Sequence, residues 1–268
     1  MKAWLFDVDG VISNLKTKEA NPQIVAEIVK RLQKKEPVAL ITGRSMKYLE
    51  DEVVPKIVAK IDKEILDTFF ISGEFGGVSS SFENGQEAEK IDEDLSVPEA
   101  LRNLVKDVTR DLETMFFDDT KKTMITTEMK DGYADMTRLK EEQESLSSKF
   151  EKLVEEFKIG INFEVVVDTI AVNIKNRNAN KKNSALQVLN WLGNKNIKPE
   201  KFIAFGDSNT DLEMAQAVHD KGFDVEFVFV GNKEDIVGIG TPFKITKTRE
   251  SYEKGTLEFL RNAVNSGS

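Results

Sequence analysis

The sequence contains no cysteine and only one histidine, His219. The absence of cysteine excludes disulfide bonds, zinc sites built from thiolates and cysteine nucleophiles. A single histidine excludes histidine-rich metal centres and disfavours a Ser-His catalytic pair. Because His219 follows a predicted helix, we expect it to be a solvated polar residue and assign it no catalytic role.

Long hydrophobic runs are also missing. No segment approaches the roughly 18 to 20 apolar residues that a membrane-spanning helix needs. The first ten residues, MKAWLFDVDG, contain acidic residues and lack the apolar centre of a signal peptide, so we expect a cytoplasmic protein. A net charge of -9 disfavours nucleic acid or an anionic membrane as the main partner. A small phosphorylated metabolite remains compatible with this charge, and the sequence predicts no oligomeric state.

The chain is 40% hydrophobic and 32% charged, which is enough for an apolar core beneath a well-solvated surface. In both terminal regions of the chain, apolar segments alternate with amphipathic ones. Fully apolar strands that alternate with helices are typical of a parallel sheet with helices on both faces. We therefore predict a doubly wound, Rossmann-like α/β fold. The expected strands are 3–6, 37–42, 68–72, 201–207 and 225–231, and the expected helices are 21–35, 46–61, 184–192, 211–218 and 255–265.

The middle of the chain has a different pattern. A helix beginning at Pro98 is followed by two apolar runs within 115–129, a charged helix over about 137–158 and a strand pair within 163–175. Strand pairs joined by short turns indicate an antiparallel sheet. We predict a discontinuous core of residues 1–78 and 176–268 with an inserted α+β domain of residues 79–175. The glycine-rich stretch GEFGG, residues 73–77, is interpreted as a hinge between them.

Polar residues follow several predicted strands at the point where each strand ends. In open parallel sheets these carboxyl ends meet at one edge, where ligands bind. Two lysines also stand at the start of the helix that precedes the fourth strand. The candidate residues are Asp7 and Asp9 in WLFDVDG, Thr42 and Gly43 in ITGRS, Lys181 and Lys182 in KKNSAL, and Asp207 and Asp211 in GDSNTD.

These side chains are chemically suited to phosphoryl transfer. Asp7 and Asp207, with Asp211 as a third candidate, would repel one another unless a hard cation lay between them, and Mg²⁺ is the natural choice. A carboxylate can attack phosphorus, and a second one can act as general acid for the leaving alcohol. The Thr42 hydroxyl, the backbone N–H groups after it and a lysine would bind the phosphate oxygens.

DVDGVIS, ITGRS, a lysine in KKNSAL and GDSNTD resemble, in order, the four motifs of the haloacid dehalogenase superfamily of phosphatases. The resemblance implies that Asp7 is the nucleophile and Asp9 the general acid/base. It further implies Mg²⁺ held by Asp7, Asp207 and the Asp9 main-chain carbonyl, with Asp211 ligating or orienting the metal. Relatives often read Lys-Gly-x-Ala-Leu, and this alignment favours Lys182 over Lys181 as the phosphate-binding lysine.

The position of the inserted domain resembles that of a C2-type cap, which implies a relationship to Cof-like, sucrose-phosphate and trehalose-phosphate phosphatases. ISGEFGGV, however, lacks the Gly-x-His-Gly expected of the trehalose-phosphate group. The predicted function is Mg²⁺-dependent hydrolysis of a small phosphate monoester, a sugar or polyol phosphate, through an aspartyl-phosphate. The first alternative is a phosphomutase or phosphotransferase with the same chemistry. The second is a non-catalytic phospho-acceptor signalling module, which the inserted domain and the paired aspartates disfavour.

Overall fold

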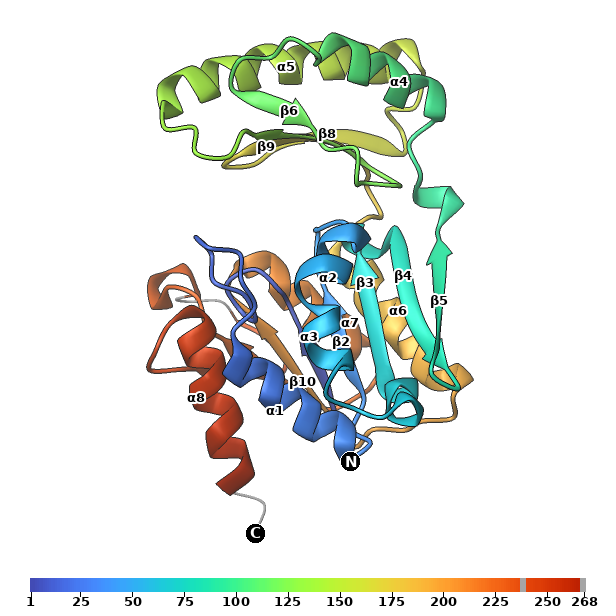
Figure 1. Ribbon diagram of the computed structural model, residues 1–268, viewed down its shortest axis with the longest axis vertical. Coiled ribbons are helices and arrows are strands. Elements are labelled where there is room, and N and C mark those ends of the chain that lie inside the picture. Colours follow the sequence, from blue (N-terminus) through green and yellow to red (C-terminus); the bar gives the residue numbers. More distant parts are fainter. Residues whose placement is uncertain (237–239, 266–268) are drawn as a thin grey trace. The chain divides into compact units, whose positions relative to one another are not determined.

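The computed structural model describes residues 1–236 and 240–265, which form two compact units (Figure 1). The core unit contains residues 1–90 and 180–268, and the inserted unit contains residues 91–179. The first boundary therefore lies twelve residues later than the predicted one, because two further strands join the core sheet. The second boundary lies four residues later, after the last strand of the inserted unit.

The core unit contains one eight-stranded sheet in the order β12-β11-β10-β1-β2-β3-β4-β5. All the pairings from β12 to β3 are parallel, whereas β4 is antiparallel to β3. The predicted apolar runs all form strands of the parallel part. The bounds are β1 Lys2–Phe6, β2 Val38–Ile41, β3 Phe69–Gly73, β4 Val78–Glu83, β5 Gln86–Ile91, β10 Lys201–Gly206, β11 Val225–Phe229 and β12 Lys244–Lys247.

Helices cover both faces of this sheet, as the prediction of a doubly wound fold requires. Successive strand residues point to opposite faces, so Phe6 and Phe205 pack on one side while Leu5 and Ala204 pack on the other. The first side is covered by α1 Pro22–Gln33, α2 Met46–Glu52, α3 Val54–Val58 and α8 Tyr252–Asn265, and the second by α6 Lys181–Asn194 and α7 Leu212–Asp220.

Local sequence explains where two of these helices begin and end. The side chain of Asn21 accepts a hydrogen bond from the Gln23 backbone N–H, and Pro22 occupies the first turn of α1, as predicted. The single helix predicted over 46–61 is instead two short helices, α2 and α3. Pro55 has no N–H to donate within a continuous helix, so the chain breaks at Val53, whose φ is -118°.

The interpretation of residues 73–77 as a hinge is wrong. Gly73 is the last residue of β3, and Glu74–Gly76 form a short 3-10 turn that leads directly into β4 of the same sheet. Glu74 is completely buried, and its backbone N–H donates to the Arg44 carbonyl. This stretch is therefore part of the packed core unit.

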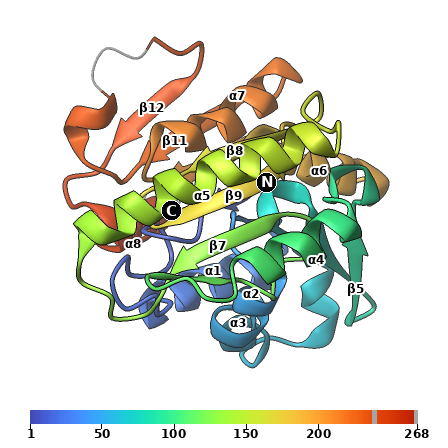
Figure 2. The same ribbon diagram turned by 90° about the horizontal axis from the view of Figure 1, so that it is seen from above.

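The inserted unit is a four-stranded antiparallel sheet with two helices, as predicted. Its helices share one apolar cluster with one face of the sheet, and Figure 2 shows the two helices lying side by side over the strands. Leu101 and Val105 from one helix, and Leu146 and Phe150 from the other, are buried in that cluster. The elements are α4 Glu99–Val108, β6 Met115–Phe117, β7 Ile125–Met129, α5 Met136–Glu156, β8 Phe163–Val167 and β9 Ala171–Asn176.

Across residues 1–236 and 240–265, no helix combines the length and the hydrophobicity needed to cross a bilayer.

Candidate active site

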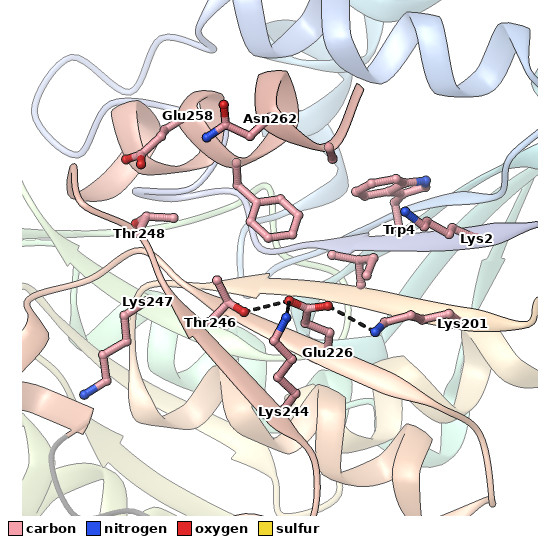
Figure 3. A pocket seen from close by; sticks show the side chains of 13 residues that line it. Lys2, Trp4, Lys201, Glu226, Lys244, Thr246, Lys247, Thr248, Glu258 and Asn262 are labelled. Atoms are coloured by element: carbon pink, nitrogen blue, oxygen red, sulfur yellow. Dashed lines mark hydrogen bonds and ion pairs between the residues drawn. The ribbon is translucent and has the colours of Figure 1, made fainter. Parts of the chain in front are cut away.

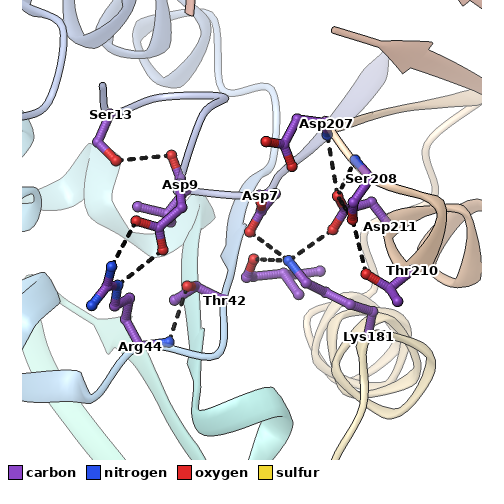
Figure 4. A network of polar contacts seen from close by, with 12 residues as sticks. Asp7, Asp9, Ser13, Thr42, Arg44, Lys181, Asp207, Ser208, Thr210 and Asp211 are labelled. Atoms are coloured by element: carbon purple, nitrogen blue, oxygen red, sulfur yellow. Dashed lines mark hydrogen bonds and ion pairs between the residues drawn. The ribbon is translucent and has the colours of Figure 1, made fainter. Parts of the chain in front are cut away.

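Three neighbouring strands bring their carboxyl ends together at the candidate site (Figure 4). Phe6 of β1 lies opposite Phe205 of β10 and Leu40 of β2, so the next residues of these strands lie at the same edge. The Asp7 backbone N–H donates to the Phe205 carbonyl at 3.1 Å, which extends the ladder by one residue and fixes the position of Asp7. The predicted convergence of strand ends is therefore present.

Asp7, Asp207 and Asp211 form a compact carboxylate cluster. Each offers an oxygen atom, and these atoms all lie within 4.8 Å of one another. The Lys181 ammonium lies 2.5 Å from Asp7 Oδ1 and 3.0 Å from Asp211 Oδ1, and it also donates to the Ile41 carbonyl at 2.9 Å. One buried ammonium thus pairs with two of the three carboxylates.

Asp211 is held in place by its neighbours in the GDSNTD turn. Its Oδ2 atom accepts hydrogen bonds from the backbone N–H groups of Asp207 and Ser208, at 3.1 and 3.0 Å, and from the Ser208 hydroxyl at 2.7 Å. Its other oxygen is left for Lys181. Asp211 is 1% exposed, and these hydrogen bonds fix its side chain at the edge of the sheet.

Two glycines of the motifs are required by close approach. Gly10 has a φ of +73°, a conformation that side chains disfavour, and a Cβ atom there would overlap the Asp207 carboxylate. A Cβ atom at Gly206 would overlap the Asp211 side chain. The turns after β1 and β10 therefore need glycine to bring the acidic groups together.

The surroundings of the cluster disfavour the ionised forms of two of its carboxyl groups. Burial raises the pKa of Asp7 well above its usual value, although Lys181 acts in the opposite direction. Burial and the nearby Asp211 raise the pKa of Asp207 to about 7. Burial alone would lower the pKa of Lys181, but Asp211 and Asp7 raise it overall, so the ammonium stays charged. A divalent cation would relieve the remaining repulsion.

The donor set fits such an ion. Asp7, Asp207 and Asp211 offer only oxygen ligands, which are the ligands that hard cations such as Mg²⁺ prefer. Thiolate ligands are absent from the chain, and the sequence supplies one imidazole, His219 of α7. The cluster is therefore chemically suited to a divalent cation with oxygen coordination.

Asp9 lies beside the cluster but is paired with a different group. Its carboxylate accepts hydrogen bonds from Arg44 Nε at 3.0 Å and Arg44 Nη2 at 3.1 Å, and the Lys18 ammonium lies 3.8 Å away. Burial would raise the pKa of Asp9, but the charge and hydrogen bonds of Arg44 lower it overall. Asp9 is therefore held as a carboxylate in this arrangement (Figure 4).

Thr42 follows β2 directly and is 1% exposed. Its backbone N–H donates to the Ser72 carbonyl at 2.9 Å, and its hydroxyl accepts from the Arg44 backbone N–H at 3.1 Å. Gly43 comes next, and the ring of Phe75 occupies the space that a Cβ atom would need there. The predicted phosphate-binding turn is thus present as a packed loop, and its role stays a prediction.

The lysine prediction must be corrected. Lys181, not Lys182, reaches the carboxylate cluster, whereas Lys182 is exposed. The helix begins at Lys181 behind an N-cap, Asn180, whose side chain accepts from the Asn183 backbone N–H. This cap sets the rotation of the first turn and directs Lys181 inward. Arg44 was missed by the sequence analysis, although its charge two residues after Thr42 was the available signal.

A comparison with protein families supports what the geometry indicates. The model for haloacid dehalogenase-like hydrolases matches residues 46–225, which is more than half of the chain. The chain belongs to this family. The predicted resemblance to haloacid dehalogenase-like proteins is therefore confirmed at the level of the family, and the protein is a hydrolase. A sequence search of curated proteins found no match.

Solved structures of similar fold include three that span nearly all of this haloacid dehalogenase-like chain. A trehalose-6-phosphate phosphatase from Aspergillus fumigatus is 17% identical, with 98% of this chain and 93% of that chain covered and a TM-score of 0.57. A haloacid dehalogenase-like hydrolase from Bacteroides thetaiotaomicron is 14% identical, covers 98% and 99%, and has a TM-score of 0.64. The trehalose-6-phosphate phosphatase C-terminal domain from Candida albicans is 16% identical, covers 98% and 92%, and has a TM-score of 0.64. At these identities the likeness shows a common fold.

Proposed function

We propose that this hydrolase is a Mg²⁺-dependent phosphatase that cleaves a small phosphate monoester through an aspartyl-phosphate on Asp7. The observation that carries the proposal is the buried Asp7 carboxylate, which shares one strand edge with Lys181, Asp207 and Asp211. A nucleophile, an ammonium for the phosphate and a set of oxygen ligands are the parts that phosphoryl transfer requires.

Each group has a proposed role. Asp7, Asp207, Asp211 and the Asp9 main-chain carbonyl would hold the cation, which when bound neutralises charge on the phosphate. The Lys181 ammonium, the Thr42 hydroxyl and the Gly43 backbone N–H would bind phosphate oxygens. The Lys181 side chain is fixed by the Ile41 carbonyl as well as by Asp7, so it is preorganised to receive the phosphate.

The reaction has two steps. In the first, an Asp7 carboxylate oxygen forms a bond to phosphorus, the bond from phosphorus to the leaving oxygen breaks, and Asp9 gives a proton to that oxygen. In the second, Asp9 takes a proton from water, the water oxygen bonds to phosphorus, and the bond from phosphorus to Asp7 breaks. Inorganic phosphate leaves and the Asp7 carboxylate is restored.

The contact between Asp9 and Arg44 suits the second step, in which Asp9 acts as a base. A carboxylate held in the ionised form is ready to act as the base for water. To act as an acid, Asp9 must take up a proton and leave the guanidinium. We therefore assign the arrangement in Figure 4 to the base form of the enzyme.

A sugar or polyol phosphate is the proposed substrate class. The support comes from the ITGRS and GDSNTD motifs and from the trehalose-6-phosphate phosphatases among the structures of similar fold. The inserted unit, which has its own sheet and core, is the proposed source of substrate choice. The sequence around residues 73–77 departs from the trehalose-phosphate pattern, so the proposal extends to other sugar phosphates.

The test is phosphate release from a panel of sugar phosphates, nucleotides and cofactor phosphates, with Mg²⁺ and after chelation by EDTA. We expect release from at least one sugar or polyol phosphate, its loss on chelation, and its recovery when Mg²⁺ is returned. The Asp7→Asn variant should be inactive while giving a normal circular dichroism spectrum. Full release by Asp7→Asn would refute the proposed nucleophile. Transfer of the phosphoryl group to a second sugar, with no inorganic phosphate, would establish the mutase alternative.

A further inference from the structure

A cavity lies at the ends of β1 and β10 that are opposite to the candidate active site (Figure 3). It has a volume of about 490 Å³ and is lined by residues of β1, β10, β11, β12 and α8. Lys2, Lys201 and Lys244 are the first residues of their strands, whereas Asp7 and Asp207 follow the last ones. At about 3.3 Å per residue, the five-residue step along β1 places Lys2 about 16 Å from Asp7. The cavity is therefore separate from the candidate active site.

The lining of this cavity has an excess of positive charge. Four lysines line the cavity, together with two glutamates, Glu226 and Glu258. The lysines are Lys2, Lys201, Lys244 and Lys247. The whole chain has a net charge of -9, so this surplus is opposite in sign to the rest of the molecule. Such a local reversal of charge favours an anionic ligand.

Glu226 arranges two of the lysines on the floor of the cavity. Its Oε1 atom lies 2.7 Å from the Lys244 ammonium and accepts from the Thr246 hydroxyl at 2.6 Å, while Oε2 lies 3.1 Å from the Lys201 ammonium. Glu226 is 7% exposed. Burial would raise its pKa, but these donors lower it to about 2, so the carboxylate remains ionised. Lys201 also lies 3.7 Å from Asp224 Oδ2, so two carboxylates face these two ammonium groups. The surplus positive charge at the cavity comes from the further lysines Lys2 and Lys247.

An apolar wall adjoins these charges. Trp4, Ile203 and Phe259 line the cavity, and the Trp4 indole is fixed by a 2.7 Å hydrogen bond from its Nε1 to Glu36. Trp4 is 3% exposed and the Arg31 guanidinium lies 4.2 Å from its ring centroid, so Phe259 is the more accessible ring of this wall. Strands of a doubly wound sheet are usually apolar on both faces because helices cover them. Here Lys201, Glu226 and Thr246 lie beside that wall instead. The volume is within the range of about 300 to 1,000 Å³ that small-molecule sites occupy.

We propose that this cavity is a binding site for a small organic anion with a flat aromatic body, whose anionic group pairs with Lys201 and Lys244 and whose ring packs against Phe259, beside the buried Trp4. The proposal does not depend on phosphatase activity. A ligand here would contact β1 and β10, the strands that end at Asp7 and Asp207.

The two tryptophans of the chain allow a direct test. Trp4 lines the cavity, whereas Trp191 of α6 packs against Phe70 on the other face of the sheet. The indole N–H signals of ¹⁵N-labelled protein, assigned with Trp191→Phe, would be followed during titration with 2-naphthoate and with its neutral counterpart 2-naphthamide. We expect a saturable shift of the Trp4 signal, no shift of Trp191, and binding of the neutral compound weaker by about tenfold.

Matched variants separate charge from folding. Lys201→Gln/Lys244→Gln should weaken naphthoate binding by about tenfold, and Lys201→Arg/Lys244→Arg should preserve it. The control Lys47→Gln/Lys56→Gln removes two lysines remote from the cavity lining that also pair with acidic residues, and should leave binding unchanged. No saturable Trp4 shift, equal binding of the two compounds, or equal binding by the glutamine double variant would each overturn the proposal.

Discussion

Lys181 and Lys182 are adjacent in sequence but lie in opposite environments. Lys181 is 5% exposed and contacts Asp7 and Asp211, while Lys182 is exposed. We predict that Lys181→Gln lowers kcat/KM for phosphate release by about 100-fold, because a fixed donor to the phosphate is lost. In the absence of Mg²⁺ it should also cost about 3 kcal/mol of unfolding free energy, since buried carboxylates lose their ammonium. Steady-state kinetics and urea titration measure both effects.

The neighbouring lysine provides the control for this prediction. Lys182→Gln removes the same charge from the same helical turn and should change both quantities little. A larger loss of activity in Lys182→Gln than in Lys181→Gln would restore the assignment that the motif alignment favoured and contradict the one based on geometry.

At the residue scale, the sequence showed which strand ends bring their side chains together, but it did not show in which direction each side chain points. Asp7, Thr42 and Asp207 were identifiable because each follows an apolar strand of a parallel sheet. The lysine was not, because successive helical residues differ in direction by about 100°, so an error of one position turns a side chain from the site to solvent. The pairing of Arg44 with Asp9 also escaped, because it joins two loops 35 residues apart.

At the scale of elements, the turn after β1 has to be both left-handed and free of a side chain. Gly10 meets both conditions, with a φ of +73° and the Asp207 carboxylate beside its Cα. We predict that Gly10→Ala costs more than the roughly 1 kcal/mol expected from backbone strain alone, because the methyl group displaces Asp207. It should also remove the stabilisation by Mg²⁺ in a thermal melt.

Gly132 is the matched control for this turn. Its φ is +74°, but no atom lies within 4 Å of the position that a Cβ would take. Gly132→Ala should therefore show the strain alone and keep the full response to Mg²⁺. Equal losses in the two variants, with the Mg²⁺ response intact in both, would show that the approach of Gly10 to Asp207 has no role in metal binding.

The ion pairs between β10, β11 and β12 predict a pH dependence of stability. The pKa of Glu226 is about 2 in the folded protein against an ordinary value of 4.5, so its stabilising contribution is complete above about pH 4.5 and disappears as the pH falls toward 2. We predict that Glu226→Gln costs about 1–2 kcal/mol near neutral pH. In urea titrations the difference from the wild type should shrink from about pH 6 to pH 3. A difference that stays constant or grows would contradict the assignment.

The predicted elements were those with a clear apolar pattern. The strands of the central sheet are apolar runs because they are buried on both faces. The outer strands β4, β5 and β12 escaped prediction because they lie toward the edges of the sheet, and β5 and β12 in particular contain mostly exposed or half-buried residues such as Glu89 and Lys244. The missed β4 and β5 also account for the displaced domain boundary.

At the scale of the whole molecule, two units with separate apolar cores predict two unfolding transitions. The core unit contains all the candidate metal ligands, while the inserted unit has its own buried cluster. Because a ligand stabilises only the unit that binds it, Mg²⁺ should raise the midpoint of one transition and leave the other unchanged. Calorimetry with Mg²⁺ and with EDTA measures this. Equal shifts of both transitions would contradict independent unfolding of the units.

The proposed phosphorylation of Asp7 can be tested directly by rapid acid quenching with ³²P-labelled p-nitrophenyl phosphate and Mg²⁺. Nitrophenolate needs no proton to leave, so Asp9→Asn should complete the first step and fail at the second, for which it lacks the base. We predict that label accumulates in Asp9→Asn on the tryptic peptide that contains Asp7, and that Asp7→Asn carries none. Label on a different peptide, or labelling of Asp7→Asn equal to that of Asp9→Asn, would contradict Asp7 as the nucleophile.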